Sequence, residues 1–423
     1  MKLDVFEDRQ KIEDLDRDVR KILKDNDLLD DSDFSVKFCG VIFTLDRTIS
    51  FLPLGAQACG SKNPNKIGHT ISLIDAIEKY ERQQNLDYEI SAAKADKPTK
   101  DYLGLIRELY RDFCEFGIYE RKATRRTINQ GKPDWKRTLQ RTPFPSFKGD
   151  PLFFEIDSKI PVYQSNCQIA AIHRGIIKDI DNKHGWLFTK KEKPFAPEIA
   201  FSPEKLPAPA RQINLLKKEK TKVFTNREIR LINLLISYLS DPSSDGNPKI
   251  LGYKDFEYVW EHLLREVFNG DETVSAKMPI PITKSKGTVS PSLSNKPRID
   301  IFLTDQKHLT IIDAKYYSGT KDAFPPWSDL VKQFFYKTAA REHPREFDPI
   351  ENWFVFPGES DNKSIDSIHV QKQCKDEELL DEQFPPIQCY YAKPMVIIRA
   401  YVDEKHLDFQ ELSKKLDTHT PLP

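Results

Sequence analysis

The chain has 423 residues, of which 39% are hydrophobic and 31% charged, so its length excludes a single small module and its apolar content excludes general disorder. Lysine and arginine together number 65, as do aspartate and glutamate, so no net charge draws the whole molecule to nucleic acid or to an anionic membrane.

The cysteine pattern and the apolar runs bear on the compartment. Six cysteines are scattered without a C-x-x-C pair, which predicts free thiols in a reducing compartment and no structural zinc. The first residues alternate charged and isolated apolar side chains, unlike a secretory signal. The longest apolar stretch, 231–239, is less than half of the about 20 residues that cross a bilayer. We therefore expect a cytoplasmic protein with no membrane partner.

The first 190 residues mix helical and strand patterns. Apolar residues near helical spacing from Val5 to Leu23 predict an amphipathic helix, and two β-type runs predict a hairpin around Asp46-Arg47. Helices are then expected at 71–84 and 102–119, and strands at 151–157, 160–165 and 185–188. These elements predict an N-terminal α+β domain over residues 1–190 that binds DNA or a partner.

Repeated prolines among charged residues predict a linker over residues 191–224. A capping-box pattern, Thr225-x-x-Glu228, then starts a helix, and another is expected at 256–268. Strands at 298–303, 309–315, 352–356 and 394–402 and a helix at 328–341 complete the pattern. The fold class expected over 225–423 is an α/β domain with a mixed central sheet.

An acid and an acid–x–lysine triplet occupy neighbouring apolar strands of this second domain. Asp300 sits inside KPRIDIFL, and the strand LTIIDAKYY ends in Asp313-Ala314-Lys315. Strand side chains alternate, so Asp313 and Lys315 project from the same face. Two converging carboxylates form a hard oxygen site suited to Mg²⁺, to which the Ala314 carbonyl can add a ligand. The Lys315 ammonium can orient a water molecule and offset negative charge in the transition state.

These residues resemble the two half-motifs of the PD-(D/E)xK nuclease superfamily, with Arg298-Ile299-Asp300 as the first and Asp313-Ala314-Lys315 as the second. The resemblance implies a Glu from an upstream helix, and we favour Glu261 over Glu257 because Glu261 is set deepest among apolar residues. It also implies a supporting downstream helix, here carrying Gln333. The metal would be Mg²⁺, with Mn²⁺ as a substitute, held by Asp300, Asp313, Glu261 and Ala314.

A narrower resemblance rests on GKPDWKRTLQRTPF (131–144), FEYVWEHLL and DAKYY, which look like the LlaJI restriction endonuclease family, related to McrC. It implies a DNA-cleaving subunit of a restriction and defence system that cuts double-stranded DNA with a separate McrB-like AAA+ GTPase. The chain contains no G-x-x-x-x-G-K-[ST] motif, so we expect no nucleotide to be bound by this chain. A homodimer is compatible with the sequence.

Three alternatives stay open. The nuclease fold can be inactive and serve as a DNA-binding or assembly component that stimulates a partner NTPase. Glu261 can be a helix carboxylate that pairs with Arg265, and Gln333 can be an ordinary residue of an exposed helix face.

A basic run at 121–141 contains one acid, Asp134, among eight cationic residues. It can contact DNA phosphates, dock on an acidic partner surface or form a solvated loop around Trp135. The candidate DNA-binding residues are Arg125, Arg126, Lys132, Lys136 and Arg137.

Overall fold

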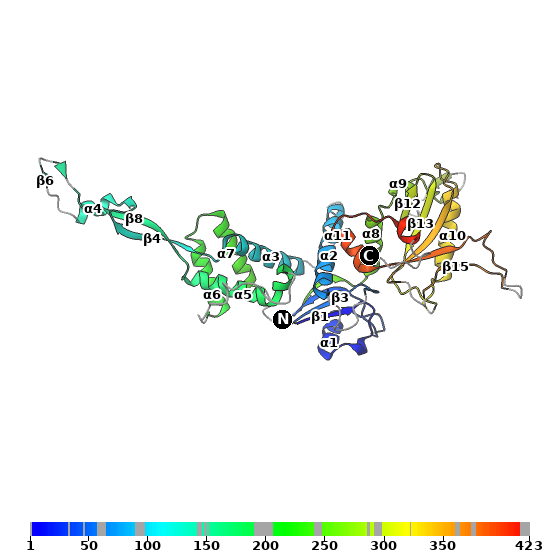
Figure 1. Ribbon diagram of the computed structural model, residues 1–423, viewed down its shortest axis with the longest axis horizontal. Helices are drawn as coiled ribbons and strands as arrows, with labels where there is room; N and C mark the ends of the chain where they lie inside the picture. Colours follow the sequence, from blue (N-terminus) through cyan, green and yellow to red (C-terminus); the bar gives the residue numbers. More distant parts are fainter. Residues whose placement is uncertain are drawn as a thin grey trace. The chain divides into compact units, whose positions relative to one another are not determined.

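Internal contacts divide the chain of this computed structural model into two units (Figure 1). The main unit joins Lys2–Ala95 to Pro248–Pro423, and the inserted unit is Asp96–Asn247. The structure describes residues 2–32, 34–44, 47–56, 65–88, 98–141, 146–147, 150–151, 153–189, 206–240, 248–285, 288–291, 298–321, 323–359, 364–373 and 378–414.

A four-stranded sheet brings distant segments of the main unit together. Its order is β1 (Lys2–Glu7), β3 (Arg47–Leu52), β2 (Cys39–Phe43) and β9 (Lys249–Tyr253), with β1 parallel to β3. The predicted hairpin is confirmed by the antiparallel β2–β3 pair, although Asp46 lies outside the described residues. The predicted N-terminal helix is partly wrong, since residues 2–7 form a strand in register with β3 and only α1 (Arg17–Asp25) is helical.

Two glycines face each other where β2 meets β9. Gly40 pairs with Gly252, and a Cβ added at Gly252 would lie 2.4 Å from the Cys39 carbonyl oxygen. The two backbones therefore approach too closely to admit a side chain at this position. The same pair lies in the contact by which strand β9 joins the N-terminal sheet.

We expect Gly252→Ala to destabilise the main unit by about 1–3 kcal/mol, because the methyl group forces the two strands apart. Thermal unfolding followed by circular dichroism measures the loss. Gly104→Ala is the matched control, since a Cβ there meets nothing within 4 Å and the residue lies in a helix. Equal melting temperatures for the Gly252 variant and the wild type would contradict the close approach.

A five-stranded mixed sheet is the second sheet of the main unit. Its order is β12 (Ile301–Asp305), β13 (His308–Ala314), β14 (Ile350–Pro357), β16 (Ile387–Ala392) and β15 (Ser367–Ile368). The pairs β13–β14 and β14–β16 are parallel, and the outer pairs are antiparallel. The mixed central sheet predicted for this half is therefore confirmed.

Helices pack on this sheet and beside it. Helix α10 (Trp327–Arg341) buries Leu330, Ala339 and Ala340 in two apolar clusters with sheet residues. Helices α8 (Phe256–Val267), α9 (Glu272–Ser275) and α12 (Phe409–Lys414) belong to the same unit, as do α2 (Lys66–Tyr88) and the hairpin β10–β11 (Ile282–Ser285, Thr288–Pro291). The strand predicted at 394–402 is wrong: this segment is helix α11 (Pro394–Val402), which starts with proline and buries six of its side chains.

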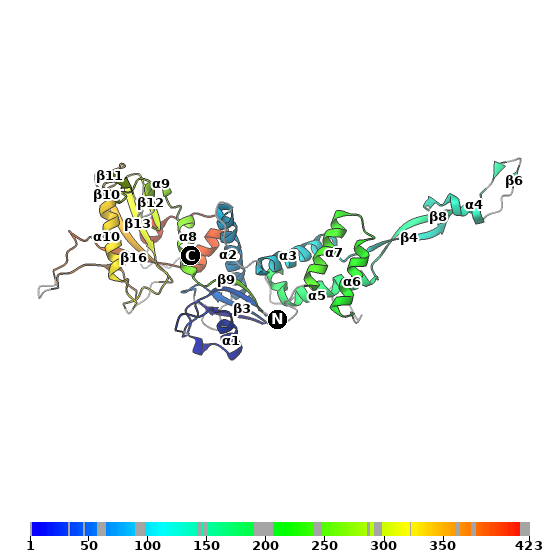
Figure 2. The same ribbon diagram turned by 180° about the vertical axis from the view of Figure 1, so that it is seen from behind.

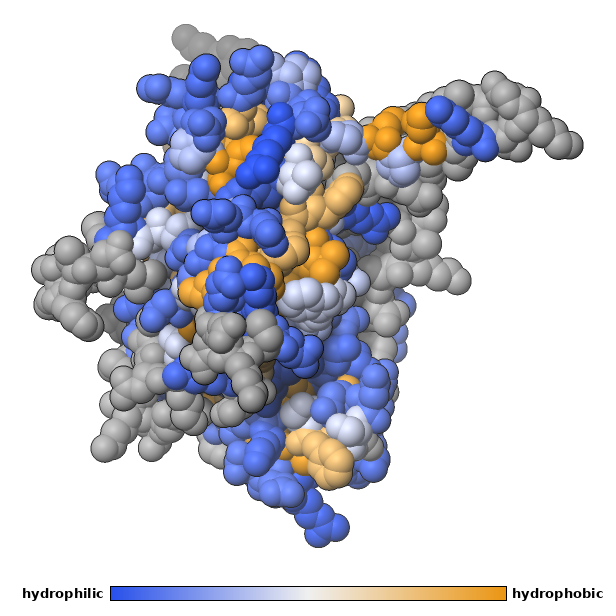
Figure 3. Space-filling view, turned by 90° about the vertical axis from the view of Figure 1, so that its right-hand side faces the viewer, coloured by the Kyte–Doolittle hydropathy of each residue, from blue (hydrophilic) through white to orange (hydrophobic). Residues whose placement is uncertain are grey.

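The outer face of α10 carries apolar side chains. Trp327, Val331 and Phe335 follow one another at four-residue spacing and are 62%, 47% and 57% exposed. Figure 3 shows a face of the molecule on which hydrophobic residues are exposed among mostly hydrophilic ones. None of the helices in the described part of the chain is long and apolar enough to cross a membrane.

The inserted unit consists of helices and a narrow β-ribbon. Its longer helices are α3 (Pro98–Phe116), α5 (Gln168–Thr189), α6 (Pro209–Lys220) and α7 (Asn226–Leu239). Strand β4 (Arg121–Ile128) pairs with β8 (Asp157–Gln164), which also pairs with β5 (Lys132–Pro133). Figures 1 and 2 show this ribbon leading from the helices of the unit to α4 (Trp135–Arg141) and the short pair β6–β7 (Ser146–Phe147, Asp150–Pro151).

The contacts correct the expected domain division. Helix α6 occupies residues 209–220 of the predicted linker, while residues 191–205 lie outside the described part. The β2–β9 pair joins both sides of the expected boundary, and α6 and α7 group with α3 and α5. The strand predicted at 185–188 is also wrong, because it is the end of α5. The capping box is confirmed, since the Thr225 side chain accepts a hydrogen bond from the Glu228 amide.

Candidate active site

Two aspartates lie side by side where β12 and β13 meet. Ile301 pairs with Ile312, so the register extended by one residue sets Asp300 opposite Asp313. The Ala314 amide donates a hydrogen bond to the Asp300 carboxylate, with 2.8 Å between N and Oδ2. The antiparallel hairpin thus brings together the two acids that the sequence separates by thirteen positions.

The lysine of the triplet reaches back to the same cluster. Lys315 Nζ lies 2.6 Å from Asp313 Oδ2, as expected for side chains on one face of a strand. It also lies 2.7 Å from Asp329 Oδ2, and the side chains of all three residues are less than one fifth exposed. The ammonium group is therefore fixed between two carboxylates.

Sequence reasoning missed Asp329. It stands in the first turn of α10, where acidic residues are common for reasons of helix stability alone. Nothing in its spacing from Lys315 predicts the contact, because the contact depends on how α10 packs against the sheet. The only signal was its place on the helix already expected to carry Gln333.

Charge repulsion and burial perturb the acids of the cluster. Burial, followed by the charges of Asp313 and Glu261, raises the pKa of Asp300 to about 8. Burial and the charge of Asp313 also raise the pKa of Glu261. Glu261 is therefore electrostatically linked to both aspartates.

The lysine responds in the opposite way. Burial alone would lower the pKa of Lys315, but the carboxylates of Asp313 and Asp329 raise it above the usual range for lysine. Lys315 therefore stays protonated at neutral pH. It can orient a ligand or offset negative charge, but it is a poor acceptor of a proton.

Of the two α8 glutamates weighed for the site, Glu257 and Glu261, the first has another partner. It forms an ion pair with Arg9, 3.7 Å between Arg9 Nη2 and Glu257 Oε2. Arg265 donates to the backbone carbonyl of Asp300 at 2.9 Å, and no ion pair between Arg265 and Glu261 is found among the described residues. Glu257 is engaged by Arg9 and Glu261 is not engaged by Arg265, which agrees with the preference for Glu261 as the acid near the cluster.

The cluster can be compared with the needs of a divalent cation. Carboxylates whose pKa values are raised by one another repel, and Mg²⁺ would relieve that repulsion with the oxygen ligands it prefers. Within the described part of the chain, no three His, Cys, Asp or Glu side chains already stand grouped to hold a metal ion. The donor chemistry fits, and the metal roles of Asp300, Asp313, Glu261 and the Ala314 carbonyl stay predictions.

Helix α10 brings a further polar face toward these residues. Gln333 is fully buried one turn after Asp329, and neither its side-chain oxygen nor its nitrogen has a hydrogen-bond partner in the structure. The Tyr336 hydroxyl donates to the Arg298 carbonyl at 3.1 Å, and burial followed by the charges of Asp313 and Asp300 raises the pKa of Tyr336. The alternative that Gln333 is an ordinary residue of an exposed helix face is therefore wrong. Its catalytic role stays a prediction.

The basic run lies in the inserted unit. Arg125, Arg126, Lys132 and Lys136 are exposed on β4, β5 and α4. Arg137 differs, since its Nε lies 3.7 Å from Asp157 Oδ1. The four exposed residues have no ion pair with any described residue, whereas Arg137 has a partner that holds it to the ribbon.

Comparisons with known proteins give one family. The model of the LlaJI restriction endonuclease family matches residues 38–375. Among solved structures, the chain is similar to a half-complex of Thermococcus gammatolerans McrB AAA+ hexamers with bound McrC, with 11% identity, a TM-score of 0.34, and coverage of 95% of this chain and 99% of that chain. A Thermococcus gammatolerans McrBC complex matches with 9% identity, a TM-score of 0.24, and coverage of 56% and 78%. No curated protein matches the chain.

Proposed function

Since the chain belongs to the LlaJI restriction endonuclease family, we propose that it is the Mg²⁺-dependent DNA endonuclease subunit of a restriction system and hydrolyses phosphodiester bonds in the cytoplasm. The observation that carries the proposal is the cluster of Asp300, Asp313 and Lys315, in which two acids and an ammonium group converge at adjacent strands. Buried charges of this kind are costly, which favours a functional reason for keeping them.

In this proposal each side chain has a distinct role. Asp300, Asp313 and Glu261 hold the cation, with the Ala314 carbonyl as a further ligand. The cation supplies Lewis-acid stabilisation of the phosphoryl oxygens. Lys315, which stays protonated, orients the attacking water and offsets the charge that develops on the phosphate. Gln333 supports the site from α10.

We further propose that the chain works with a separate McrB-like AAA+ GTPase, as the family resemblance implies. The McrC of the solved assembly is bound to McrB AAA+ hexamers. Incubation of the full chain with plasmid DNA and Mg²⁺, with and without the partner and GTP, tests both parts. We expect linear products only when Mg²⁺ is present, and no cleavage under either condition would contradict the endonuclease assignment.

One observation favours the second candidate, an inactive component that stimulates a partner NTPase. Lys315 already forms ion pairs with both Asp313 and Asp329, so these two carboxylates have a partner without a metal ion. In that case GTP hydrolysis by the partner would rise on addition of the chain, and an Asp313→Asn variant would stimulate it equally, while neither protein cleaves DNA.

Asp329 gives a prediction about how Lys315 is held. We expect Asp329→Asn to lower the cleavage rate by about 10- to 100-fold with little change in Mg²⁺ dependence, because the ammonium group loses one of its two anchors. Cleavage rates over a Mg²⁺ series measure both quantities.

Lys332→Ala is the matched control, since it removes the exposed partner of Asp329 at 3.4 Å and leaves the Lys315 contact in place. A cleavage rate of Asp329→Asn equal to that of the control would show that Asp329 does not position Lys315.

We also propose that the basic run contacts DNA phosphates through Arg125, Arg126, Lys132 and Lys136. The triple variant Arg125→Ala, Arg126→Ala, Lys136→Ala should weaken binding to all duplex sequences and reduce the slope of log affinity against log salt by about 0.9 for each lost contact. Fluorescence anisotropy of the full chain on a short duplex measures the slope. An unchanged slope together with reduced partner-stimulated cleavage would assign the run to partner docking instead.

A further inference from the structure

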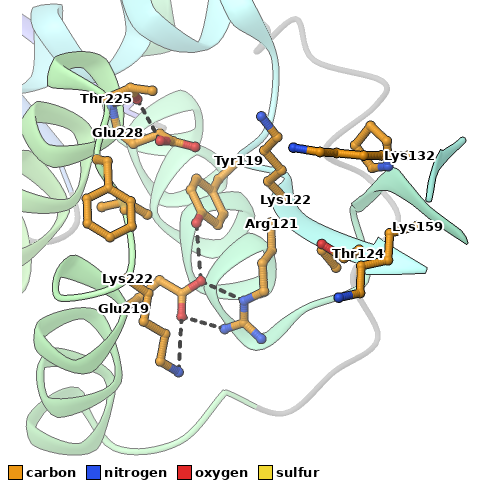
Figure 4. A pocket seen from close by; sticks show the side chains of 14 residues that line it. Tyr119, Arg121, Lys122, Thr124, Lys132, Lys159, Glu219, Lys222, Thr225 and Glu228 are labelled. Carbon is orange, nitrogen blue, oxygen red and sulfur yellow. Dashed lines mark hydrogen bonds and ion pairs between the residues drawn. The ribbon is translucent and has the colours of Figure 1, made fainter. Parts of the chain in front are cut away.

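A pocket of about 610 Å³ lies in the inserted unit, where the β-ribbon meets α6 and α7 (Figure 4). Five of its lining residues are cationic and two are acidic: Arg121, Lys122, Lys132, Lys159 and Lys222 against Glu219 and Glu228. A volume of this size suits a small molecule. The charge balance of the lining favours an anionic ligand.

The acidic residues of the pocket are already bound. Glu219 is 3% exposed and holds the Arg121 guanidinium at two positions, 2.6 Å to Nε and 2.7 Å to Nη2. It also accepts a hydrogen bond from the Tyr119 hydroxyl at 3.2 Å (Figure 4). Glu228 bonds to the Thr225 hydroxyl at 2.6 Å. Because Arg121 and Glu219 are engaged with each other, the positive charges available to an anionic ligand are those of the lysines.

The lysines converge from one face of the ribbon. Lys132 pairs with Lys159 across the sheet, and Lys122 pairs with Tyr163, which lies four residues beyond Lys159 on β8. Lys159 has a partner, Asp134, at 2.6 Å. Lys122 and Lys132 are exposed and have no ion pair with any described residue. The pocket therefore presents two ammonium groups that have no ion pair within the described part of the chain. Beside them lie Lys159, paired with Asp134, and Lys222, 3.9 Å from Glu219.

The remaining pocket residues include an aromatic ring and a hydroxyl group, which can contact an uncharged part of an anionic ligand. Phe224 lines the pocket and is 88% exposed, so a ring face is accessible for stacking. The Thr124 side chain, also in the lining, offers a hydroxyl. Ammonium groups act as point charges that suit phosphate oxygens, and an aromatic face suits a nucleobase.

We propose that this pocket binds a nucleoside polyphosphate, with Lys122 and Lys132 on the phosphates and Phe224 against the base. The absent P-loop excludes only a glycine-rich backbone cradle, and recognition here uses side-chain ammonium groups instead. The proposal departs from the expectation that this chain binds no nucleotide. It does not depend on the proposed cleavage chemistry, because the pocket contains none of the cluster residues, and it shares only Lys132 with the proposed DNA contacts.

The test is anisotropy of a fluorescent nucleoside triphosphate titrated with the full chain in the absence of DNA. We expect saturable binding that the double variant Lys122→Ala, Lys132→Ala weakens at least about tenfold. Lys217→Ala is the control, because it removes an exposed lysine of helix α6 that does not line the pocket. Phe224→Ala should weaken nucleotide binding several-fold and leave competition by inorganic tripolyphosphate unchanged.

Three results would overturn the proposal. The first is the absence of saturable binding, and the second is equal affinity of the double variant and the Lys217 control. The third is binding of a single-stranded oligonucleotide that depends on Lys122 and Lys132 while the free nucleotide does not bind, which would assign the pocket to a nucleic-acid strand. None of these results depends on DNA cleavage, so failure of this proposal is distinguishable from failure of the proposed nuclease activity.

Discussion

Replacing Lys315 by alanine is expected to lower the rate of Mg²⁺-dependent DNA cleavage by about 100- to 1,000-fold, the loss typical of removing one preorganised charge from a transition state. The ammonium group lies 2.6 Å from Asp313 and 2.7 Å from Asp329, and alanine at this position leaves both carboxylates without that positive charge. Single-turnover cleavage of plasmid DNA with the partner present measures the effect. A variant that cleaves at the wild-type rate would remove Lys315 from the proposed mechanism.

The same substitution also has a structural cost that must be separated from the catalytic one. Loss of the ammonium leaves the carboxylates of Asp313 and Asp329, both less than one fifth exposed, without their common cation. We expect a lower melting temperature for Lys315→Ala. The double variant Lys315→Ala, Asp329→Asn removes one of the two stranded charges, so it should regain stability without regaining cleavage. Recovery of both together would show that the loss of activity is only a folding defect.

Asp300→Asn is expected to abolish cleavage and to stabilise the metal-free protein. The pKa of Asp300 is raised to about 8, first by burial and then by Asp313 and Glu261. Between about pH 4, where an unfolded aspartate ionises, and pH 8, the folded protein keeps a proton that the unfolded chain loses. Unfolding therefore releases a proton, and this carboxyl lowers stability progressively as the pH rises through that window.

The stability gain of Asp300→Asn should accordingly be small near pH 4 and reach on the order of 5 kcal/mol at pH 8. Melting temperatures of both proteins in EDTA over this pH range measure it. Mg²⁺ should raise the melting temperature of the wild type more than that of the variant, because only the wild type keeps the carboxylate.

The control for this series is Asp305→Asn, an exposed aspartate at the far end of β12, the strand that directly follows Asp300. It should show neither the pH-dependent gain nor the loss of cleavage. A gain for Asp300→Asn that is constant from pH 4 to pH 8 would mean that the carboxyl is not the titrating group.

The site was predictable from the sequence where its contacts are local. Asp313 and Lys315 share a face because strand side chains alternate, and Asp300 meets Asp313 through a hairpin of adjacent strands. Asp329 was not predictable, because its contact with Lys315 depends on the packing of a helix that follows the strand. A pattern of residues in one strand contains no information about that packing.

The fold shows the same limit. Hairpin β2–β3 and helices α8 and α10 follow from periodicity, whereas the pairing of β2 with β9 joins residues more than 200 positions apart and defeated the expected domain boundary. The segment 394–402 was misread because a short, nearly continuous apolar run fits a buried strand as well as a buried helix. Its starting proline was the overlooked helix signal.

The order of segments along the chain also has a consequence during synthesis. Strand β9, which completes the N-terminal sheet, leaves the ribosome only after the whole of Asp96–Asn247 has been made. The N-terminal strands must therefore wait with an open edge while the insertion is translated, and the acids of the cluster emerge later still. A nascent chain interrupted before residue 300 lacks Asp300, Asp313 and Lys315, so under the proposed function it would have no site for cutting DNA.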